Sequence, residues 1–138
     1  MSEPIAGPDG QVLFRVDELA CKGSGVLRLH PGFADELRTL RLRWARPMRV
    51  TSCCRSTAHN TAEGGAANSL HVYDVPSYPG QQGTLAIDVA VSDPVTRWEL
   101  VFIAMGLGWS VGMPQKGRGF MHFDRRDMVG QPRLLFDY

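Results

Sequence analysis

An aspartate stands inside an apolar segment that otherwise has the composition of a buried strand. Asp88 lies between Ile87 and Val89 in the run Leu85–Ala90. Aliphatic and β-branched residues favour strands, and successive side chains of a strand point to opposite faces. A buried carboxylate without a partner is costly, so the fold must bring a cation or a hydrogen-bond donor to this position. Only arrangements in which Asp88 faces such groups are compatible with this segment.

A second apolar segment, Phe120–Asp124, carries two more ionisable residues. Strand alternation places His122 and Asp124 on one face of this segment, together with Phe120. One strand therefore offers a histidine and an aspartate on the same side, while another strand offers Asp88.

Two histidines and one aspartate make a three-ligand set that suits Zn²⁺ and leaves a fourth position for water. A hydrolase needs such an open position, because the metal lowers the pKa of its water to about 7 and polarises a carbonyl group. The residues alone leave a second interpretation open, in which Asp88 caps a helix or pairs with an arginine in the core.

Two segments show the spacing of amphipathic helices. From about 33 to 45, apolar residues recur on one helical face, and a proline soon afterwards ends the pattern. A second helix is predicted to begin at Asp93–Pro94, since Asp is a preferred N-cap and Pro suits the first helical position. Its apolar stripe runs from Val95 through Trp98 to Met105, and we expect this stripe to face the core.

Strands are predicted at 49–52, 85–91, 109–112 and 119–123. Helices packed on a small, mostly antiparallel sheet form an α+β fold. The length of 138 residues predicts a single domain, 1–138. Residues 1–11 are rich in Pro and Gly and are interpreted as a flexible N-terminal arm.

Composition argues against several classes of function. Hydrophobic residues make up 43% and charged residues 21% of the chain, as in ordinary globular proteins. A net charge of +1 gives no support for a nucleic-acid or membrane partner, so a charged substrate must be recognised locally. No apolar run reaches the ~18 residues of a membrane span, and no secretory signal is recognisable. The three cysteines, of which Cys53 and Cys54 are adjacent, favour synthesis in a reducing compartment.

Short motifs follow one another in order along the chain: Thr51–Arg55, His59–Asn60, Gly64–Gly65, Ser69–His71, Ala86–Asp88 and Phe120–Asp124. This series resembles the zinc D-Ala-D-Ala carboxypeptidase and endopeptidase family, which shares its fold with the Hedgehog signalling domain. The segments Phe14–Cys21 and Pro47–Ser52 look like those of phage and prophage members of the group. The resemblance runs from about Phe14 to Arg125 and rests on the ordered set rather than on any one motif.

The resemblance implies a Hedgehog/D-Ala-D-Ala-peptidase-like fold in which His71, Asp88 and His122 bind zinc. Arg55 would hold a substrate carboxylate or carbonyl oxygen and stabilise the oxyanion, a task that suits a permanently charged, forked guanidinium. Ser69 would help to orient the substrate or the zinc site. The implied activity is hydrolysis of amide bonds in peptidoglycan stem peptides or cross-links, with zinc-bound water as the nucleophile, by a carboxypeptidase or an endopeptidase. Such a protein would act on the cell wall as a phage endolysin or virion component, or after export by another route.

The segment between His71 and Asp88 departs from the family pattern, because it is longer than in many relatives. Its residues 72–83 are rich in Pro, Gly, Tyr and Gln. That composition is typical of a loop, which we expect to project from the site and to select the substrate.

The general base is the second departure. Relatives often place it two or three positions before the last ligand, where this chain has Gly119 and Phe120. Neither residue can accept a proton. Asp124 is the best substitute, although it could equally be a partner that holds the last histidine ligand in the right tautomer. Glu63 and Asp74 are more distant candidates.

Two further interpretations are left open. The Hedgehog domain keeps zinc while it serves as a ligand for other proteins, so the chain could be a zinc-containing, non-catalytic binding or structural module of a phage virion. A cysteine-based site that uses Cys53 or Cys54 with His59 has less support, because no clear oxyanion-hole motif accompanies it.

Overall fold

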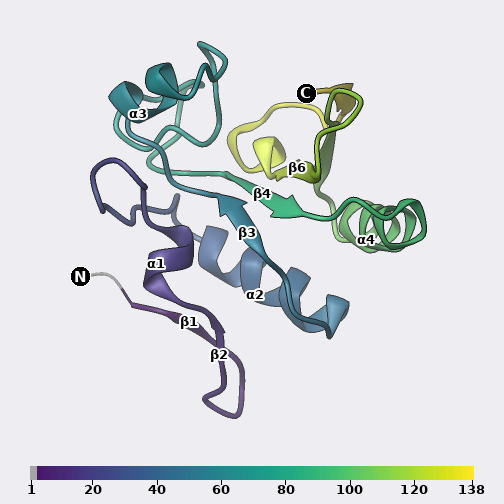
Figure 1. The fold of residues 1–138 in the computed structure, drawn as a ribbon. Coiled ribbons are helices and arrows are strands. Elements are labelled where there is room, and N and C mark those ends of the chain that lie inside the picture. Colours follow the sequence, from purple (N-terminus) through teal and green to yellow (C-terminus); the bar gives the residue numbers. More distant parts are fainter. Residues whose placement is uncertain (1–2) are drawn as a thin grey trace.

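A five-stranded sheet forms the centre of the molecule (Figure 1). The computed structural model describes residues 3–138. In spatial order the strands are β3 (Val50–Ser52), β4 (Ala86–Ala90), β6 (Phe120–Asp124), β5 (Ser110–Met113) and β7 (Leu135–Asp137). The pairs β3·β4, β4·β6 and β5·β6 are antiparallel, whereas β5·β7 is parallel. The predicted α+β fold with a mostly antiparallel sheet is therefore confirmed.

Helices cover the sheet and flank one of its sides. The described helices are α1 (Val16–Leu19), α2 (Phe33–Trp44), α3 (Thr57–Ala62), α4 (Pro94–Gly106) and the short 3-10 helix η1 (Arg126–Val129). In Figure 1, α2 lies beneath the sheet, α3 and its neighbouring loops lie above it, and α4 runs along the side. Helix α4 contacts both α2 and β5. Among these described helices, none has the length and apolar character needed to cross a membrane.

The core lies between α2 and the sheet. Phe33, Leu37, Leu40 and Trp44 are buried along α2, which confirms the predicted apolar face of this helix. They belong to the same hydrophobic cluster as Ile87 of β4. Because strand neighbours alternate, β4 turns Ile87 toward this core and Asp88 toward the opposite face.

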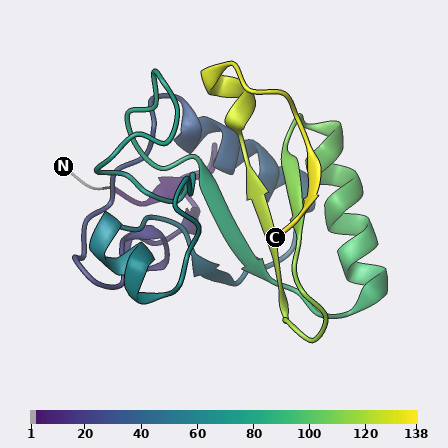
Figure 2. The ribbon, with the colours of Figure 1, turned by 90° about the horizontal axis from the view of Figure 1, so that it is seen from above.

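One row of paired positions crosses the whole sheet, whose strands Figure 2 shows from above, and determines where the polar face is built. Ser52 pairs with Asp88, Asp88 with His122, His122 with Gly112, and Gly112 with Phe136. Directly paired residues project to the same face of a sheet. The row therefore gathers residues from all five strands on the face that lies away from α2.

The N-terminal segment contains a short hairpin. β1 (Ile5–Ala6) pairs antiparallel with β2 (Val12–Phe14), and Ile5 is buried. One buried apolar side chain and a short hairpin thus hold this part of the predicted arm, residues 1–11, against the core. Residues 1 and 2 of the predicted arm lie outside the described residues.

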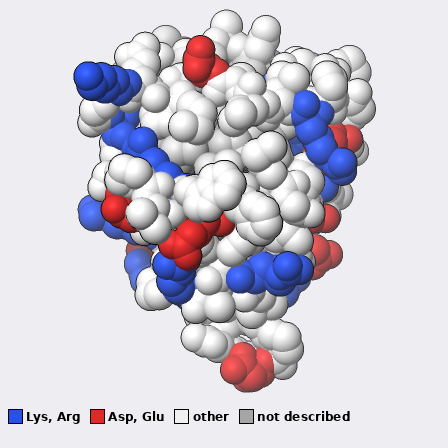
Figure 3. Space-filling view, turned by 90° about the vertical axis from the view of Figure 1, so that its right-hand side faces the viewer, with Lys and Arg blue, Asp and Glu red and all other residues white. Residues whose placement is uncertain are grey.

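Helix α4 begins as predicted but turns a different face inward. Asp93 caps it by accepting a hydrogen bond from the backbone N–H of Thr96 at 2.8 Å. Trp98, predicted to lie in the core, is 69% exposed, whereas Leu100 and Ala104 are buried. Several sides of the helix are apolar, so spacing alone did not identify the buried one. Figure 3 shows this side of the molecule, where a broad uncharged area has basic and acidic groups around it.

Candidate metal centre

Three buried side chains, His71, Asp88 and His122, converge above the middle of the sheet. Asp88 on β4 pairs directly with His122 on β6, and His71 lies in the segment between α3 and β4. Asp88 Oδ1 lies 3.0 Å from His71 Nε2 and 2.9 Å from His122 Nδ1. Taking one ligand atom from each residue, all three lie within 4.8 Å of one another. The fold thus brings together the three residues predicted to bind zinc.

His71 is held with its Nε2 atom toward Asp88. Its Nδ1 atom lies 2.7 Å from the carbonyl oxygen of Cys53, which can only accept, so Nδ1 carries the proton and donates. Burial lowers the pKa of His71 below its ordinary value, despite the opposing effect of the Asp88 charge. Nε2 therefore keeps a lone pair that faces the carboxylate.

His122 is oriented by Asp124 on the same strand. Its Nε2 atom lies 2.8 Å from Asp124 Oδ2, which places the other ring nitrogen, Nδ1, toward Asp88. Arg126 in turn donates to both oxygens of Asp124, at 2.9 Å and 2.7 Å. Burial lowers the pKa of His122, but its hydrogen bonds to Asp124 and Asp88 outweigh this effect and raise the pKa above its ordinary value. Carboxylate–histidine pairs of this kind fix the ring orientation of metal ligands.

The chemistry of this donor set fits zinc. When the outer nitrogens of His71 and His122 carry the protons, two nitrogen lone pairs and Asp88 Oδ1 point toward one another. Such a group of electron-pair donors needs positive charge among them, which a proton on His122 supplies in the metal-free protein and a bound metal ion would supply in its place. Zn²⁺ binds nitrogen and oxygen ligands tetrahedrally at about 2.0–2.2 Å, which separates neighbouring ligand atoms by about 3.4 Å. The contacts of Asp88 Oδ1 with the two imidazoles are close to that separation.

The second oxygen of Asp88 has partners of its own. Oδ2 accepts hydrogen bonds from Arg55 Nη2 at 3.1 Å and from the Tyr138 hydroxyl at 3.3 Å. Burial raises the pKa of Asp88, but the two histidines outweigh it, so the pKa lies well below its ordinary value and the group is ionised. One oxygen is thus held by the protein, and the other faces the histidine nitrogens.

Arg55 is fixed by three different side chains. Its Nε donates to Ser52 Oγ at 2.8 Å, its Nη1 to Asn60 Oδ1 at 3.2 Å, and its Nη2 to Asp88. Asn60 also donates to the carbonyl oxygen of Ala66 at 2.9 Å, so α3 and the following loop are tied to the arginine. These contacts give Arg55 one clear task, which is to balance the buried charge of Asp88. Its predicted contact with substrate stays a prediction.

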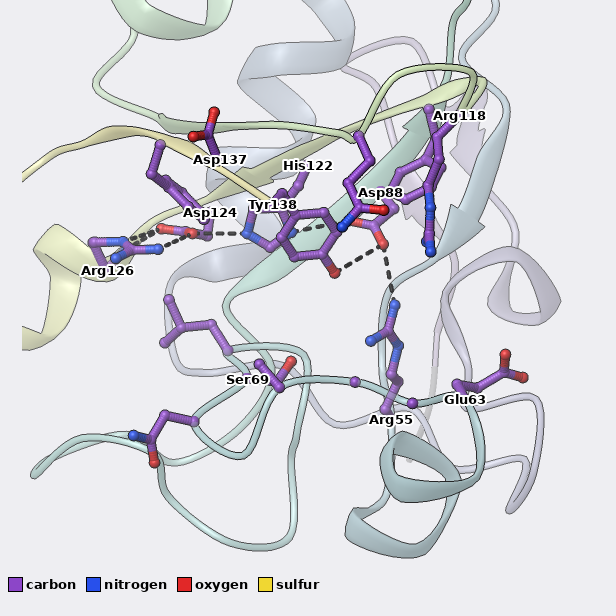
Figure 4. Close-up of a pocket in the computed structure, with 18 residues that line it drawn as sticks. Arg55, Glu63, Ser69, Asp88, Arg118, His122, Asp124, Arg126, Asp137 and Tyr138 are labelled. Carbon is purple, nitrogen blue, oxygen red and sulfur yellow. Dashed lines mark hydrogen bonds and ion pairs between the residues drawn. The ribbon is translucent and has the colours of Figure 1, made fainter.

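The cluster lies in the floor of a pocket of about 390 Å³ (Figure 4). Asp88 and His122 line this pocket, whereas His71 is fully buried behind them. The walls come from three segments, within 63–70, 115–120 and 136–138. A metal held by these residues would therefore be reached through the pocket.

Ser69 lies in the wall of the pocket and is buried. Its Oγ accepts a hydrogen bond from the backbone N–H of His71 at 3.2 Å, and its carbonyl oxygen accepts one from Ser77 Oγ at 2.8 Å. The first contact is compatible with the predicted part of Ser69 in orienting the zinc site. Its contact with substrate stays a prediction.

Residues 72–83, predicted to project from the site, are instead folded back against the protein. Gln81 is buried and donates to the carbonyl oxygens of Val72 and Gly83, at 3.2 Å and 2.9 Å. Asp74 accepts from the backbone N–H of Thr57 at 2.9 Å, at the start of α3. None of the described residues of this segment lines the pocket. Its predicted part in selecting the substrate stays a prediction.

A cysteine-based site is not supported either. Cys53 and Cys54 are buried, and neither lines the pocket. Burial raises the pKa of the Cys53 thiol well above its ordinary value, and a neutral thiol is a poor nucleophile. His59 contacts the carboxylate of Glu63, at 3.4 Å, rather than either cysteine.

Two residues that sequence reasoning missed contribute to the site. Arg126 pairs with Asp124, and its position just after the His–x–Asp motif was the available signal. Tyr138 follows β7 and stacks on the imidazole of His122, with ring centroids 4.1 Å apart and planes at 21°. Burial, helped by the charge of Asp88, raises the pKa of Tyr138 to about 12, so its hydroxyl keeps its proton. No motif in the sequence points to this tyrosine.

Two buried histidines and an aspartate, set below an open pocket in an α+β fold, define a candidate zinc centre of the kind that hydrolases use. The Peptidase M15 family model matches residues 13–124, and the chain belongs to this family of zinc-dependent peptidases. The match includes all three candidate ligands, while β7 and Tyr138 lie beyond it. No curated protein and no solved structure matches the chain.

Proposed function

We propose that the protein is a zinc peptidase that hydrolyses amide bonds in peptidoglycan stem peptides or their cross-links. Membership of a peptidase family supports the reaction class. The observation that carries the proposal is the buried His–Asp–His cluster beneath an open pocket. His71, Asp88 and His122 would hold the metal, and zinc bound there supplies Lewis-acid chemistry at a peptide carbonyl group.

Arg55 is the residue of this chain best placed to stabilise developing negative charge. Each terminal guanidinium nitrogen carries two N–H groups. Nη1 and Nη2 each make one contact with the protein, to Asn60 and Asp88, and Arg55 lines the pocket. A remaining N–H can therefore donate to a carbonyl oxygen of a bound peptide, in a site where the guanidinium is already held in place.

Two roles are proposed for Asp124, orienting the His122 ring and accepting a proton during the reaction, and they have different consequences. We expect Asp124→Asn to weaken zinc binding by about 10- to 100-fold and to keep most of kcat once zinc is saturating. The reason is that Asp124 is fully buried and both of its oxygens are engaged by His122 and Arg126. The zinc dissociation constant is measured by competition with a chromophoric chelator, and kcat at saturating zinc.

A matched control for this variant is Asp127→Asn, which alters another arginine-paired carboxylate that does not line the pocket. It should bind zinc and turn over substrate as the wild type does. Normal zinc affinity together with a kcat reduced by about 10³-fold in Asp124→Asn would identify Asp124 as the proton acceptor instead.

Arg118 offers the pocket a cation that is not neutralised by the described part of the chain. Arg55 pairs with Asp88 and Arg126 with Asp124, whereas no described carboxylate forms an ion pair with Arg118. Its guanidinium carbon lies 5.8 Å from the centre of the Phe120 ring. Stem peptides carry free carboxylates, and an arginine is well suited to bind one. We assign Arg118 to a substrate carboxylate.

Replacing Arg118 by Gln should raise KM about 10-fold for a peptide with free carboxylates, because one charge-assisted hydrogen bond is lost. The value of kcat should hardly change, since Arg118 contacts none of the candidate ligands. KM is compared between this peptide and its amidated form, with Arg46→Gln as a control on an exposed arginine outside the pocket. An equal rise in KM for both peptides would show that Arg118 does not bind the substrate carboxylate.

The proposed reaction is tested on purified peptidoglycan with zinc-loaded protein, in the presence and absence of a chelator. We expect chelator-sensitive release of free amino groups, and mass spectrometry of the fragments then identifies the bond that is cut. Protein that holds zinc and releases no amino groups would contradict the proposal.

A zinc-containing, non-catalytic binding module is the second candidate. The observation that favours it is the absence of a carboxylate two or three positions before His122, where Phe120 and Gly119 stand. Such a module would retain stem peptides on a column without cleaving them. Mass spectrometry of the peptides eluted from the column therefore distinguishes the two candidates. Intact peptides indicate binding alone, and fragments indicate hydrolysis.

A further inference from the structure

Tyr138 lies against two of the three candidate zinc ligands (Figure 4). Its ring stacks on the imidazole of His122, with centroids 4.1 Å apart, and its hydroxyl donates to Asp88 Oδ2 at 3.3 Å. The residue follows β7, outside the part of the chain that the family model matches. The contact is thus supplied by a segment that the family pattern does not include.

Gly112 makes this approach possible. It pairs with His122 on one side and with Phe136 of β7 on the other. A Cβ atom at position 112 would lie 2.9 Å from Tyr138 Cβ, closer than real Cβ contacts, and 3.0 Å from His122 Cβ, tighter than most of them. The missing side chain leaves the space in which Tyr138 reaches His122 across β5.

The backbone fixes the tyrosine as well. β7 pairs with β5 in parallel, and the N–H of Tyr138 continues this pairing by donating to the carbonyl oxygen of Met113 at 2.7 Å. The Phe136 ring also contacts the imidazole of His122, with centroids 5.6 Å apart. Both rings therefore reach His122 from strand β7 and its continuation.

Both contacts of Tyr138 restrict the orientation of a candidate ligand. Asp88 Oδ1 faces the histidine nitrogens, while Oδ2 is shared by Arg55 and the Tyr138 hydroxyl. A carboxylate whose outer oxygen is held by two donors presents its inner oxygen in a fixed direction. The stacked ring limits the rotation of the neighbouring His122 imidazole in the same way.

We propose that Tyr138 is a positioning residue of the zinc site, which supports the His122 ring by stacking and holds Asp88 Oδ2 together with Arg55. The inference rests on the metal site of the proposed function. In this view β7 and the residue after it complete a site whose candidate ligands all come earlier in the chain. A tyrosine that only covered the pocket would not require the hydroxyl, so the hydroxyl and the ring are tested separately.

Tyr138→Phe removes the hydroxyl and keeps the ring, whereas Tyr138→Ala removes both. The zinc dissociation constant of each is measured by competition with a chromophoric chelator. We expect binding about 10-fold weaker for Phe and about 100-fold weaker for Ala, the range for partners that orient metal ligands. The visible absorption of the Co²⁺-loaded proteins should change in both, because it reports the geometry of the ligands.

Tyr73→Phe is the matched control. It removes a hydroxyl that contacts Ser24 Oγ at 2.9 Å, at a residue that does not line the pocket. Its zinc affinity and Co²⁺ spectrum should equal those of the wild type. Gly112→Ala crowds both Tyr138 and His122, so it should also weaken zinc binding, and the Tyr138 variants are the ones that isolate the tyrosine.

Wild-type zinc affinity and an unchanged Co²⁺ spectrum in Tyr138→Phe and Tyr138→Ala would overturn the inference. Unchanged affinity with faster hydrolysis in Tyr138→Ala would also overturn it and would identify a cover over the pocket. Thermal unfolding of the metal-free proteins checks that each variant folds. If Tyr138→Ala does not fold, the result for Tyr138→Phe decides the test. Wild type that binds zinc but hydrolyses nothing would contradict the proposed function alone, whereas wild type that binds no zinc would contradict both.

Discussion

Replacing Asp88 by Asn should abolish zinc-dependent hydrolysis and weaken zinc binding by more than about 10²-fold, the upper range for partners that do not themselves bind the metal. The amide keeps the shape of the carboxylate but lacks the negative charge toward which the lone pairs of His71 and His122 point. A neutral oxygen is a weaker ligand for a divalent cation, and the amide nitrogen is no ligand at all. Zinc content after dialysis and release of amino groups from peptidoglycan are the measurements.

The same substitution should also destabilise the metal-free protein. Asp88 is 2% exposed and Arg55 is 9% exposed, so Asp88→Asn leaves an arginine nearly buried without its counter-charge. Removing one partner of a buried ion pair costs about 3 kcal/mol or more. The free energy of unfolding, measured with urea in the presence of chelator, should fall by about that amount. Asp88→Asn with wild-type zinc affinity would remove Asp88 from the ligand set.

Two of the three candidate ligands could be predicted because each carries a positive signal in the sequence. Asp88 is a charge in an apolar strand, and His122 alternates with apolar neighbours in a second strand. Strand alternation and antiparallel pairing then place both on one face of the sheet. His71 lacks such a local signal and was found through its place in the ordered motifs.

Tyr138 and Gly112 could not be found in this way. β7 has three residues and pairs with β5 in parallel, a non-local contact without the alternation that marks a longer strand. Gly112 contributes by the absence of a side chain, which gives no pattern to read. The partners that orient a metal ligand depend on tertiary packing, and sequence reasoning predicts them less well than the ligands.

Trp98 shows the corresponding limit for the core. The predicted stripe of α4 has the correct helical spacing, yet Trp98 and Phe102 are exposed and Leu100 and Ala104 are buried. Periodicity identifies a helix, but it selects the buried face only when the other faces are polar. In α2 the charged residues supply that contrast, and the prediction there is confirmed.

Arg55→Met should have the second largest effect, because it removes the donor to Asp88, Ser52 and Asn60 together. We expect the metal-free protein to lose about 3 kcal/mol of unfolding free energy, since Asp88 is left as a buried carboxylate. The value of kcat should fall by about 10²- to 10³-fold at saturating zinc, as when an oxyanion donor is removed. Arg55→Lys keeps the charge but not the fork, so it should recover stability better than kcat.

Arg125→Met separates stability from chemistry. Arg125 is also buried and donates to Asp127 at 2.9 Å and 3.0 Å, but it does not line the pocket. Its loss should lower the free energy of unfolding by a similar amount while zinc affinity and kcat stay at wild-type values. If Arg55→Met loses the same stability and yet retains kcat at saturating zinc, the guanidinium only balances the charge of Asp88. The negative charge that develops on the peptide carbonyl oxygen would then have to be stabilised without Arg55.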